Sequence, residues 1–211
     1  MKFTTIFFDL DDTLYPSSTN LWLAIKGRMN EFMRDRMNIP VNEIPALREK
    51  YYLQYGTTMR GLQANHNINS DDFLAYVHDL PLGNYLTPDT AQREVIASLP
   101  TRNLILTNAD SSHAERVLTQ LNLRDLFPVI VDVNAVTPYC KPMPEAFKIA
   151  MKLAGESDPS RCIMIDDLTR TTRAAKEAGM SSILFGGIAA SEDANASLSD
   201  WNKLTDILER L

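Results

Sequence analysis

The sequence is poor in cysteine, in positive charge and in long apolar runs, and each shortage excludes a class of protein. Its 211 residues include two cysteines, too few for the disulfide framework of a small secreted domain. Lysine and arginine number 21 against 27 acidic residues, which gives a net charge of -6. The chain therefore lacks the basic surplus with which proteins bind nucleic acids or anionic lipid surfaces. No apolar run approaches the ~18 residues that a membrane span needs.

The remaining composition is that of a folded domain with a sizeable core, at 45% hydrophobic and 23% charged residues. The first residues, Met1–Thr5, lead directly into an apolar run and show no signal-peptide pattern. There is no internal repeat and no low-complexity tract. We therefore expect a cytoplasmic protein that binds neither nucleic acid nor membrane.

Five short apolar runs have the composition of buried strands. Isoleucine, leucine, valine, methionine and phenylalanine follow one another in them without alternation, which is typical of strands covered on both faces. Between the later runs, apolar residues recur at helical spacing in residues 112–121, 145–154 and 169–178. Strands alternating with helices predict an α/β fold, a Rossmann-like parallel sheet with helices on both faces. The five runs are Thr4–Phe8, Asn103–Thr107, Val129–Val133, Cys162–Ile165 and Ser182–Phe185.

The stretch between Phe8 and Asn103 is far longer than a single crossover requires, and its pattern is helical. Apolar stripes at helical spacing include Leu47 and Tyr51, and Ser70 is the expected N-cap of a further helix. We predict an inserted all-helical cap at residues 17–84 and a catalytic core formed by residues 1–16 and 85–211. Because ligands bind at the carboxyl ends of parallel strands, an insertion after the first strand is expected to cover that site.

Polar residues stand where the first two predicted strands end. Asp9, Asp11 and Asp12 follow the first strand, and clustered carboxylates repel one another unless a cation or a proton relieves them. Thr107 and Asn108 follow the second strand and can donate hydrogen bonds to an oxyanion. Taken singly, each group is more typical of an ordinary turn.

Two further segments repeat this arrangement. Lys141 precedes a proline and a predicted helix, where it can place a positive charge beside a phosphate. Asp166 and Asp167 end another buried strand. Carboxylates at the ends of two parallel strands predict a shared hard cation with oxygen ligands, for which magnesium is the best candidate.

The four segments, in this order, resemble the motifs of the haloacid dehalogenase superfamily, whose members are mostly phosphatases. The resemblance implies that Asp9 is the nucleophile and forms an aspartyl-phosphate, while Asp11 is the acid–base catalyst. It implies a Mg²⁺ site formed by Asp9, the backbone carbonyl of Asp11, Asp166 and Asp167. It also implies that Thr107, Asn108 and Lys141 bind the phosphoryl oxygens of a small phosphorylated metabolite.

A closer likeness connects the chain to the pyrimidine 5′-nucleotidase branch of that superfamily. It rests on residues 55–62 (YGTTMRGL), on residues 107–110 (TNAD) and on His113-Ala114. The branch acts on nucleoside monophosphates such as UMP and CMP, and the likeness implies that Tyr55, Thr57, Thr58 and Arg60 contact base or ribose. One departure lies after the acidic pair, where this chain has Leu168 and Thr171 in place of a small polar residue and an asparagine.

Other functions remain open from the residues alone. A phospho-accepting receiver also places aspartates, a hydroxyl and a lysine on a parallel sheet, and a sugar phosphomutase uses the same core as the phosphatases. A phosphatase for other small phosphate esters, or a binding protein with little catalysis, is also compatible. The histidines are too scattered for a metal site, and we expect His113 to be exposed in the first turn of a helix. Cys140 and Cys162 are expected to be core thiols.

Overall fold

The computed structural model describes residues 2–211 and divides the chain into two compact units. One unit joins Met1–Ser17 to Leu86–Leu211, and the other comprises Ser18–Tyr85. The first is an α/β unit built from two separate stretches of chain, and the second is entirely helical.

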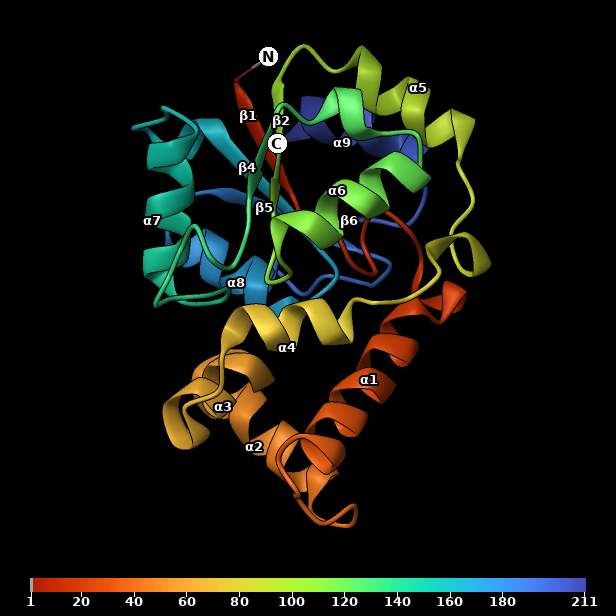
Figure 1. Ribbon diagram of the computed structural model, residues 1–211. Helices are drawn as coiled ribbons and strands as arrows, with labels where there is room; N and C mark the ends of the chain where they lie inside the picture. The colour runs from red at the N-terminus through yellow and green to blue at the C-terminus, as the bar shows by residue number, and fades with distance from the viewer. Residues whose placement is uncertain (1) are drawn as a thin grey trace. The chain divides into compact units, whose positions relative to one another are not determined.

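The α/β unit is built on a six-stranded sheet in the order β3-β2-β1-β4-β5-β6, in which every neighbouring pair is parallel. The strand that starts the chain lies inside the sheet, between two strands made much later (Figure 1). Their carboxyl ends therefore meet at one edge of the sheet, where polar side chains that follow the strands are brought together. The strands are β1 (Thr5–Phe8), β2 (Arg102–Leu106), β3 (Val129–Val131), β4 (Cys162–Asp166), β5 (Ser181–Phe185) and β6 (Ala196–Leu198).

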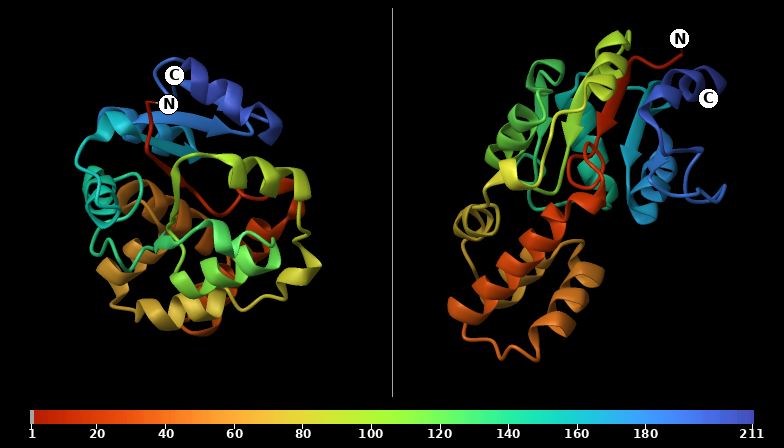
Figure 2. Two further views of the ribbon diagram at one scale, coloured as in Figure 1. Left: turned by 90° about the horizontal axis from the view of Figure 1, so that it is seen from above. Right: turned by 90° about the vertical axis from the view of Figure 1, so that its right-hand side faces the viewer.

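Helices cover both faces of this sheet. On one face, Phe7, Leu104 and Met164 form a buried core with side chains of α7 and α8 such as Phe147. On the other face, the ring of Phe8 meets Phe127 edge-on and Trp201 at a tilt. Figures 1 and 2 show α7 and α8 on one side of the strands and α5, α6 and α9 on the other. These helices are α5 (Thr90–Ser98), α6 (Ser111–Gln120), α7 (Pro144–Leu153), α8 (Thr169–Glu177) and α9 (Leu204–Arg210).

The helical unit has a core of its own. Phe32 of α1 and Phe73 of α4 pack edge to face, with ring centroids 5.1 Å apart. Helices α2 and α3 approach so closely at Gly61 that an added Cβ would lie 2.2 Å from Cγ of Tyr51. Any larger residue at 61 would therefore force these helices apart. The unit contains α1 (Leu21–Asp35), α2 (Ile44–Tyr55), α3 (Thr58–His66) and α4 (Ser70–Val77).

The predicted fold class is confirmed: the core is an α/β fold with a parallel sheet and helices on both faces. The sequence pattern did not reveal α5, α9 or the three-residue strand β6. One predicted cap is wrong, because Asn69 rather than Ser70 caps α4, its Oδ1 accepting from the backbone N–H groups of Asp71 and Asp72. The predicted third strand ends early, at Val131, where the carboxylate of Asp132 accepts the backbone N–H groups of Ser111, at the start of α6, and of Ala135, three residues further on.

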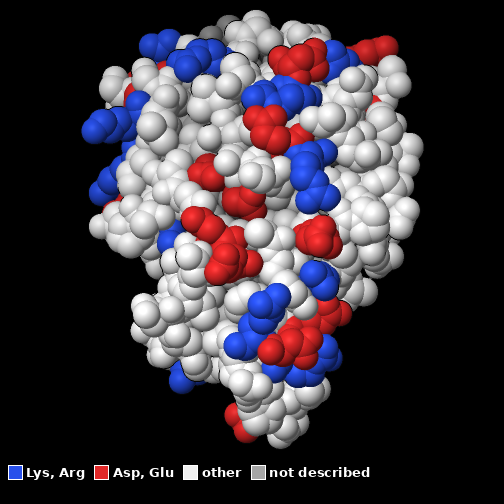
Figure 3. Space-filling model, in the orientation of Figure 1, with Lys and Arg blue, Asp and Glu red and all other residues white. Residues whose placement is uncertain are grey.

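Among the residues that the structure describes, no helix is both long and apolar enough to cross a membrane. On the face drawn in Figure 3, lysine and arginine side chains are interspersed with aspartate and glutamate.

Candidate active site

Charged side chains that lie far apart in the sequence meet at the carboxyl ends of β1 and β4. Asp9 follows β1, and its backbone N–H donates to the carbonyl oxygen of Ile165 on β4, at 2.8 Å. Asp166 is the last residue of β4, and its side chain is fully buried. The parallel pairing of β1 with β4 therefore places two carboxylates side by side in the interior.

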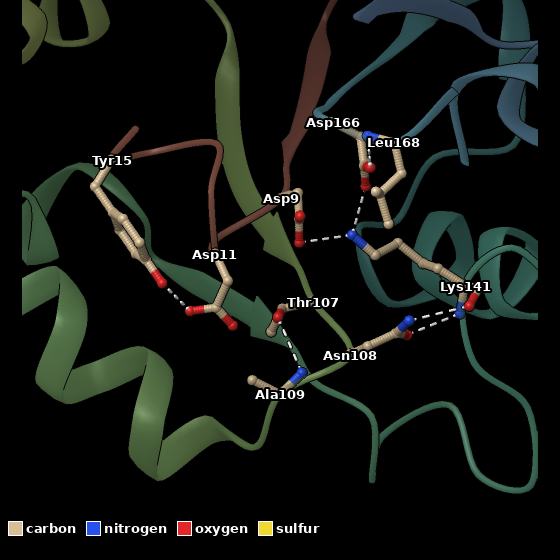
Figure 4. A network of polar contacts seen from close by, with 9 residues as sticks. All are labelled: Asp9, Asp11, Tyr15, Thr107, Asn108, Ala109, Lys141, Asp166 and Leu168. Carbon is tan, nitrogen blue, oxygen red and sulfur yellow. Dashed lines mark hydrogen bonds and ion pairs between the residues drawn. The ribbon is translucent and has the colours of Figure 1, made fainter. Parts of the chain in front are cut away.

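Lys141 lies between these two carboxylates. Its Nζ is 2.6 Å from Oδ1 of Asp9 and 2.7 Å from Oδ2 of Asp166, and only 3% of the residue is exposed (Figure 4). Burial disfavours the charged lysine, but the carboxylates of Asp166 and Asp9 outweigh it, so the pKa of Lys141 is raised. The ammonium group is thus a permanent positive charge at the strand ends.

Asp9, Asp166 and Asp167 together form a candidate metal site. Each offers a carboxylate oxygen, and these oxygens lie within 4.8 Å of one another. Burial is the main cause that raises the pKa of Asp9 well above its usual value, and neighbouring carboxylates add to it. Burial, and then the charge of Asp166, raises the pKa of Asp167 to about 7. Lys141 alone therefore does not neutralise the three groups, and their hard oxygen ligands suit a divalent cation such as magnesium.

Asn108 holds the backbone that carries Lys141. Its Nδ2 donates to the carbonyl oxygen of Lys141 at 3.0 Å, and its Oδ1 accepts from the N–H of Lys141 at 2.9 Å. Figure 4 shows this pair of bonds beside Thr107, whose Oγ1 accepts from the N–H of Ala109. The structure thus gives Asn108 a positioning contact that the sequence did not predict. The partner is the backbone of Lys141, and a contact with backbone atoms does not depend on the identity of the partner residue, so no motif indicates it.

Asp11 points to a different set of partners. Its Oδ1 accepts from the hydroxyl of Tyr15 at 2.5 Å and lies 2.9 Å from Nε2 of His113. Burial, followed by the charge of Asp11, raises the pKa of Tyr15 well above its usual value, so the phenol keeps its proton. Asp9 and Asp11 therefore have different surroundings, although only one residue separates them in the sequence. Two carboxylates in different surroundings can take different roles, one as a nucleophile and the other in acid–base catalysis.

The placement of His113 corrects the sequence-based expectation of an exposed side chain. His113 is buried, with 1% of the residue exposed, although it lies in the first turn of α6. It shares a helix face with Val117, four residues later, and that face packs into the core. The i, i+4 spacing of His113 and Val117 was the feature of the sequence that indicated the burial of His113. Cys140 and Cys162, expected in the core, are both fully buried.

The departure at Leu168 and Thr171 has a local structural consequence. The backbone N–H of Leu168 donates to Oδ1 of Asp166 at 2.9 Å. Leu168 is also the N-cap residue of α8, but its apolar side chain makes no capping hydrogen bond. Thr171 is buried, with 1% exposed.

Comparison with known protein families matches residues 3–179 to the haloacid dehalogenase-like hydrolases. Among curated proteins, phosphate metabolism protein 8 of Saccharomyces cerevisiae is 33% identical over 194 residues, which cover 84% of this chain. The chain spans 60% of the length of that yeast protein. Glyceraldehyde 3-phosphate phosphatase of Pyrococcus furiosus is 26% identical over 99% of this chain and 94% of its own length.

Solved structures share the fold at lower sequence identity. A haloacid dehalogenase-type phosphatase of Thermococcus onnurineus has a TM-score of 0.66 and 17% identity over 97% of both chains. A related hydrolase of Bacillus subtilis, solved with bound magnesium, has a TM-score of 0.62 and 16% identity over 99% of both chains.

Proposed function

The chain belongs to the haloacid dehalogenase-like hydrolases, and on this premise we propose that it is a magnesium-dependent phosphomonoesterase that works through an aspartyl-phosphate. The observation that carries the proposal is the cluster at the strand ends, in which Asp9, Asp166 and Lys141 are buried and Asp167 is partly buried. Hydrolysis of phosphate monoesters is very slow without catalysis, and it is accelerated by neutralising the phosphoryl charge and aligning a nucleophile. In this cluster the buried ammonium group contributes to neutralising the phosphoryl charge, and the fixed carboxylate of Asp9 is the aligned nucleophile.

In the first step, a carboxylate oxygen of Asp9 attacks phosphorus and the bond from phosphorus to the ester oxygen breaks. The departing oxygen takes a proton from Asp11, which is left ionised. Lys141 faces Asp9 at 2.6 Å, so it can bind a non-bridging phosphoryl oxygen there. Thr107 and Asn108, which follow the neighbouring strand β2, are the further candidates for contacts with these oxygens.

In the second step, water attacks the phosphorus of the aspartyl-phosphate and Asp11 accepts the proton that the water releases. Inorganic phosphate leaves and Asp9 is regenerated. The acid of the first step thus becomes the base of the second, and one aspartate serves both.

The oxygen ligands of this cluster fit magnesium. Asp9 and Asp167 would supply carboxylate oxygens, with Asp166 coordinating directly or through water, because Nζ of Lys141 and the N–H of Leu168 already bind its oxygens. The backbone carbonyl of Asp11 would complete the protein's ligands. When bound, the ion supplies positive charge that reduces the repulsion between Asp9 and the phosphoryl group.

For the substrate we propose nucleoside 5′-monophosphates, with pyrimidines preferred. The support is the motif likeness at residues 55–62 and 107–114, together with relatives whose names refer to phosphate metabolism and to a phosphatase of a small phosphorylated metabolite. In the motif likeness, Thr57 and Arg60 of the helical unit are the candidates for selecting the leaving group. Arg60 is 8% exposed there, and its guanidinium donates to Oε1 of Gln63.

Release of free phosphate from a panel of esters tests this function. We expect hydrolysis of UMP and CMP above that of AMP and phosphoglycolate, and loss of nearly all activity when EDTA replaces magnesium. Equal rates on the four esters contradict the preference for nucleotides but not phosphatase activity. An isomerised sugar phosphate without free phosphate indicates a phosphomutase, and a stable phosphoprotein without turnover indicates a receiver.

The apparent affinity for magnesium is expected to rise with pH up to about pH 7. The pKa of Asp167 is about 7 in the folded protein, against an ordinary value of 3.8, so below pH 7 the carboxyl group carries a proton that magnesium must displace. This proton stabilises the magnesium-free fold at low pH, and the contribution is lost as the pH rises through 7. Titration calorimetry at about pH 5.5 and about pH 8 checks the expectation.

Asp167→Asn is the matched control for that titration. The variant has no proton to displace at this position, so it should bind magnesium more weakly at high pH and show a shallower pH dependence than the wild type. Equal affinities of the wild type at both pH values contradict the prediction.

A further inference from the structure

Two donors from distant parts of the chain meet on one oxygen of Asp11. The hydroxyl of Tyr15 donates to Oδ1 at 2.5 Å, and Nε2 of His113 lies 2.9 Å from the same atom. The side chain of Asp11 is 14% exposed, while that of His113 is fully buried. An ionised carboxylate has no proton to donate, so His113 must carry its hydrogen on Nε2 when Asp11 is charged.

Both donors are fixed in place by the fold. Tyr15 is 3% exposed and lies in the same turn of chain as Asp11. His113 is held at the start of α6, where its backbone N–H donates to Oδ1 of Asp110 at 3.0 Å. The N–H of Ser111 donates to Oδ2 of Asp132 at 2.8 Å, which ties this helix start to the end of β3. The two bonds to Asp11 therefore come from side chains that have little freedom to move.

We propose that Tyr15 and His113 are positioning residues for the acid–base step: by binding Oδ1, they hold the carboxyl group of Asp11 in a constant direction. The role rests on the proposed function, and it extends that function to residues outside the four motifs. Both contacts reach the same oxygen, one from residue 15 and one from residue 113, so they fix the direction of the carboxyl group. One geometry thus serves proton donation to the ester oxygen and proton removal from water, without rearrangement between the steps.

Two aryl phosphates that differ only by a nitro group separate this role from a purely structural one. Phenolate leaves poorly without a proton, whereas 4-nitrophenolate leaves well without one, so a misplaced acid slows the first ester more than the second. We expect Tyr15→Phe and His113→Ala to lower kcat/KM for phenyl phosphate by roughly 10-fold or more, part of the ~10²–10⁴ that acid–base catalysis contributes. The loss with 4-nitrophenyl phosphate should be less than about threefold.

His113→Gln is the conservative variant. Its Nε2 stands as many bonds from Cα as Nε2 of the imidazole, so it can donate to Oδ1, and we expect it to recover most of the rate on phenyl phosphate that His113→Ala loses. Tyr85→Phe removes a hydroxyl from a half-buried tyrosine of the helical unit and controls for the loss of a phenol. Asp11→Ala gives the ratio between the two esters that corresponds to complete loss of the acid.

The outcomes distinguish this role from the function on which it rests. Equal losses on both esters, or no loss on either, in variants with wild-type thermal midpoints overturn the positioning role and leave the phosphatase intact. If His113→Ala does not fold, Tyr15→Phe decides alone, because it removes one hydroxyl and keeps the ring. A wild-type protein that hydrolyses neither ester with magnesium refutes the proposed function and this role with it.

Discussion

Asp9→Asn is expected to lower turnover by roughly 10⁴-fold or more, the scale on which loss of one nucleophile acts in covalent catalysis. The amide cannot attack phosphorus as a carboxylate does, and no aspartyl-phosphate can form at this position. Release of phosphate from the best ester of the panel measures the effect, and rapid acid quenching of the wild type should trap the phosphorylated chain. Unchanged turnover of the variant contradicts covalent catalysis through Asp9.

The fold of this variant is expected to survive, which separates catalysis from stability. The pKa of Asp9 is raised, mainly by burial, so the folded protein disfavours the charged carboxylate when no divalent ion is bound. A neutral amide of the same shape avoids that cost, while Lys141 keeps Asp166 as a partner at 2.7 Å. The thermal midpoint without magnesium should therefore be no lower than that of the wild type.

Lys141→Met is expected to reduce both stability and activity. Methionine fills much of the volume of the lysine stem but leaves Asp9 and Asp166 buried without their cation. Removing one partner of a buried ion pair costs about 3–5 kcal/mol, which corresponds to a fall of roughly 10 °C in the thermal midpoint of a protein of this size. Turnover should fall as well, because the charge that faces Asp9 is lost.

Two further variants test the cause of this destabilisation. Lys148→Met, on the exposed side of α7, removes a lysine without a buried partner and should change the midpoint little. Lys141→Met combined with Asp166→Asn removes one of the two uncompensated carboxylates and should recover part of the lost stability but none of the activity. If Lys141→Met alone is as stable as the wild type without magnesium, a stabilising role of the Lys141 charge is contradicted.

The geometry at the strand ends could be predicted because parallel strands impose it. Once residues 4–8 and 162–165 are taken as neighbouring strands, the side chains that follow them must meet, and Asp9 and Asp166 do so. The order of the strands was not predictable in this way, since apolar runs of equal character do not reveal which of them pair. Strand β6, with only three residues, is too short to show a pattern.

The surroundings of Asp11 could not be derived from the motif. The contact between His113 and Asp11 joins residues separated by 102 positions, and it depends on how the start of α6 is anchored to Asp110 and Asp132. A polar residue in the first turn of a helix is usually solvated, and only its alignment with Val117 indicated burial. Asn108 illustrates the same limit, because its partner is the backbone of Lys141 rather than a side chain.

The inner position of β1 has a consequence for synthesis of the protein. β1 is synthesised before both of the strands that flank it, which begin at Arg102 and Cys162. Thr5–Phe8 therefore lacks one of its two neighbours until Cys162–Asp166 has been made. During that interval its phenylalanines have no sheet to join, whereas the helices of Ser18–Tyr85 can form from local contacts. A nascent chain that stalls before Cys162 therefore exposes an apolar strand with one vacant edge, the kind of segment that chaperones bind and that aggregates in their absence.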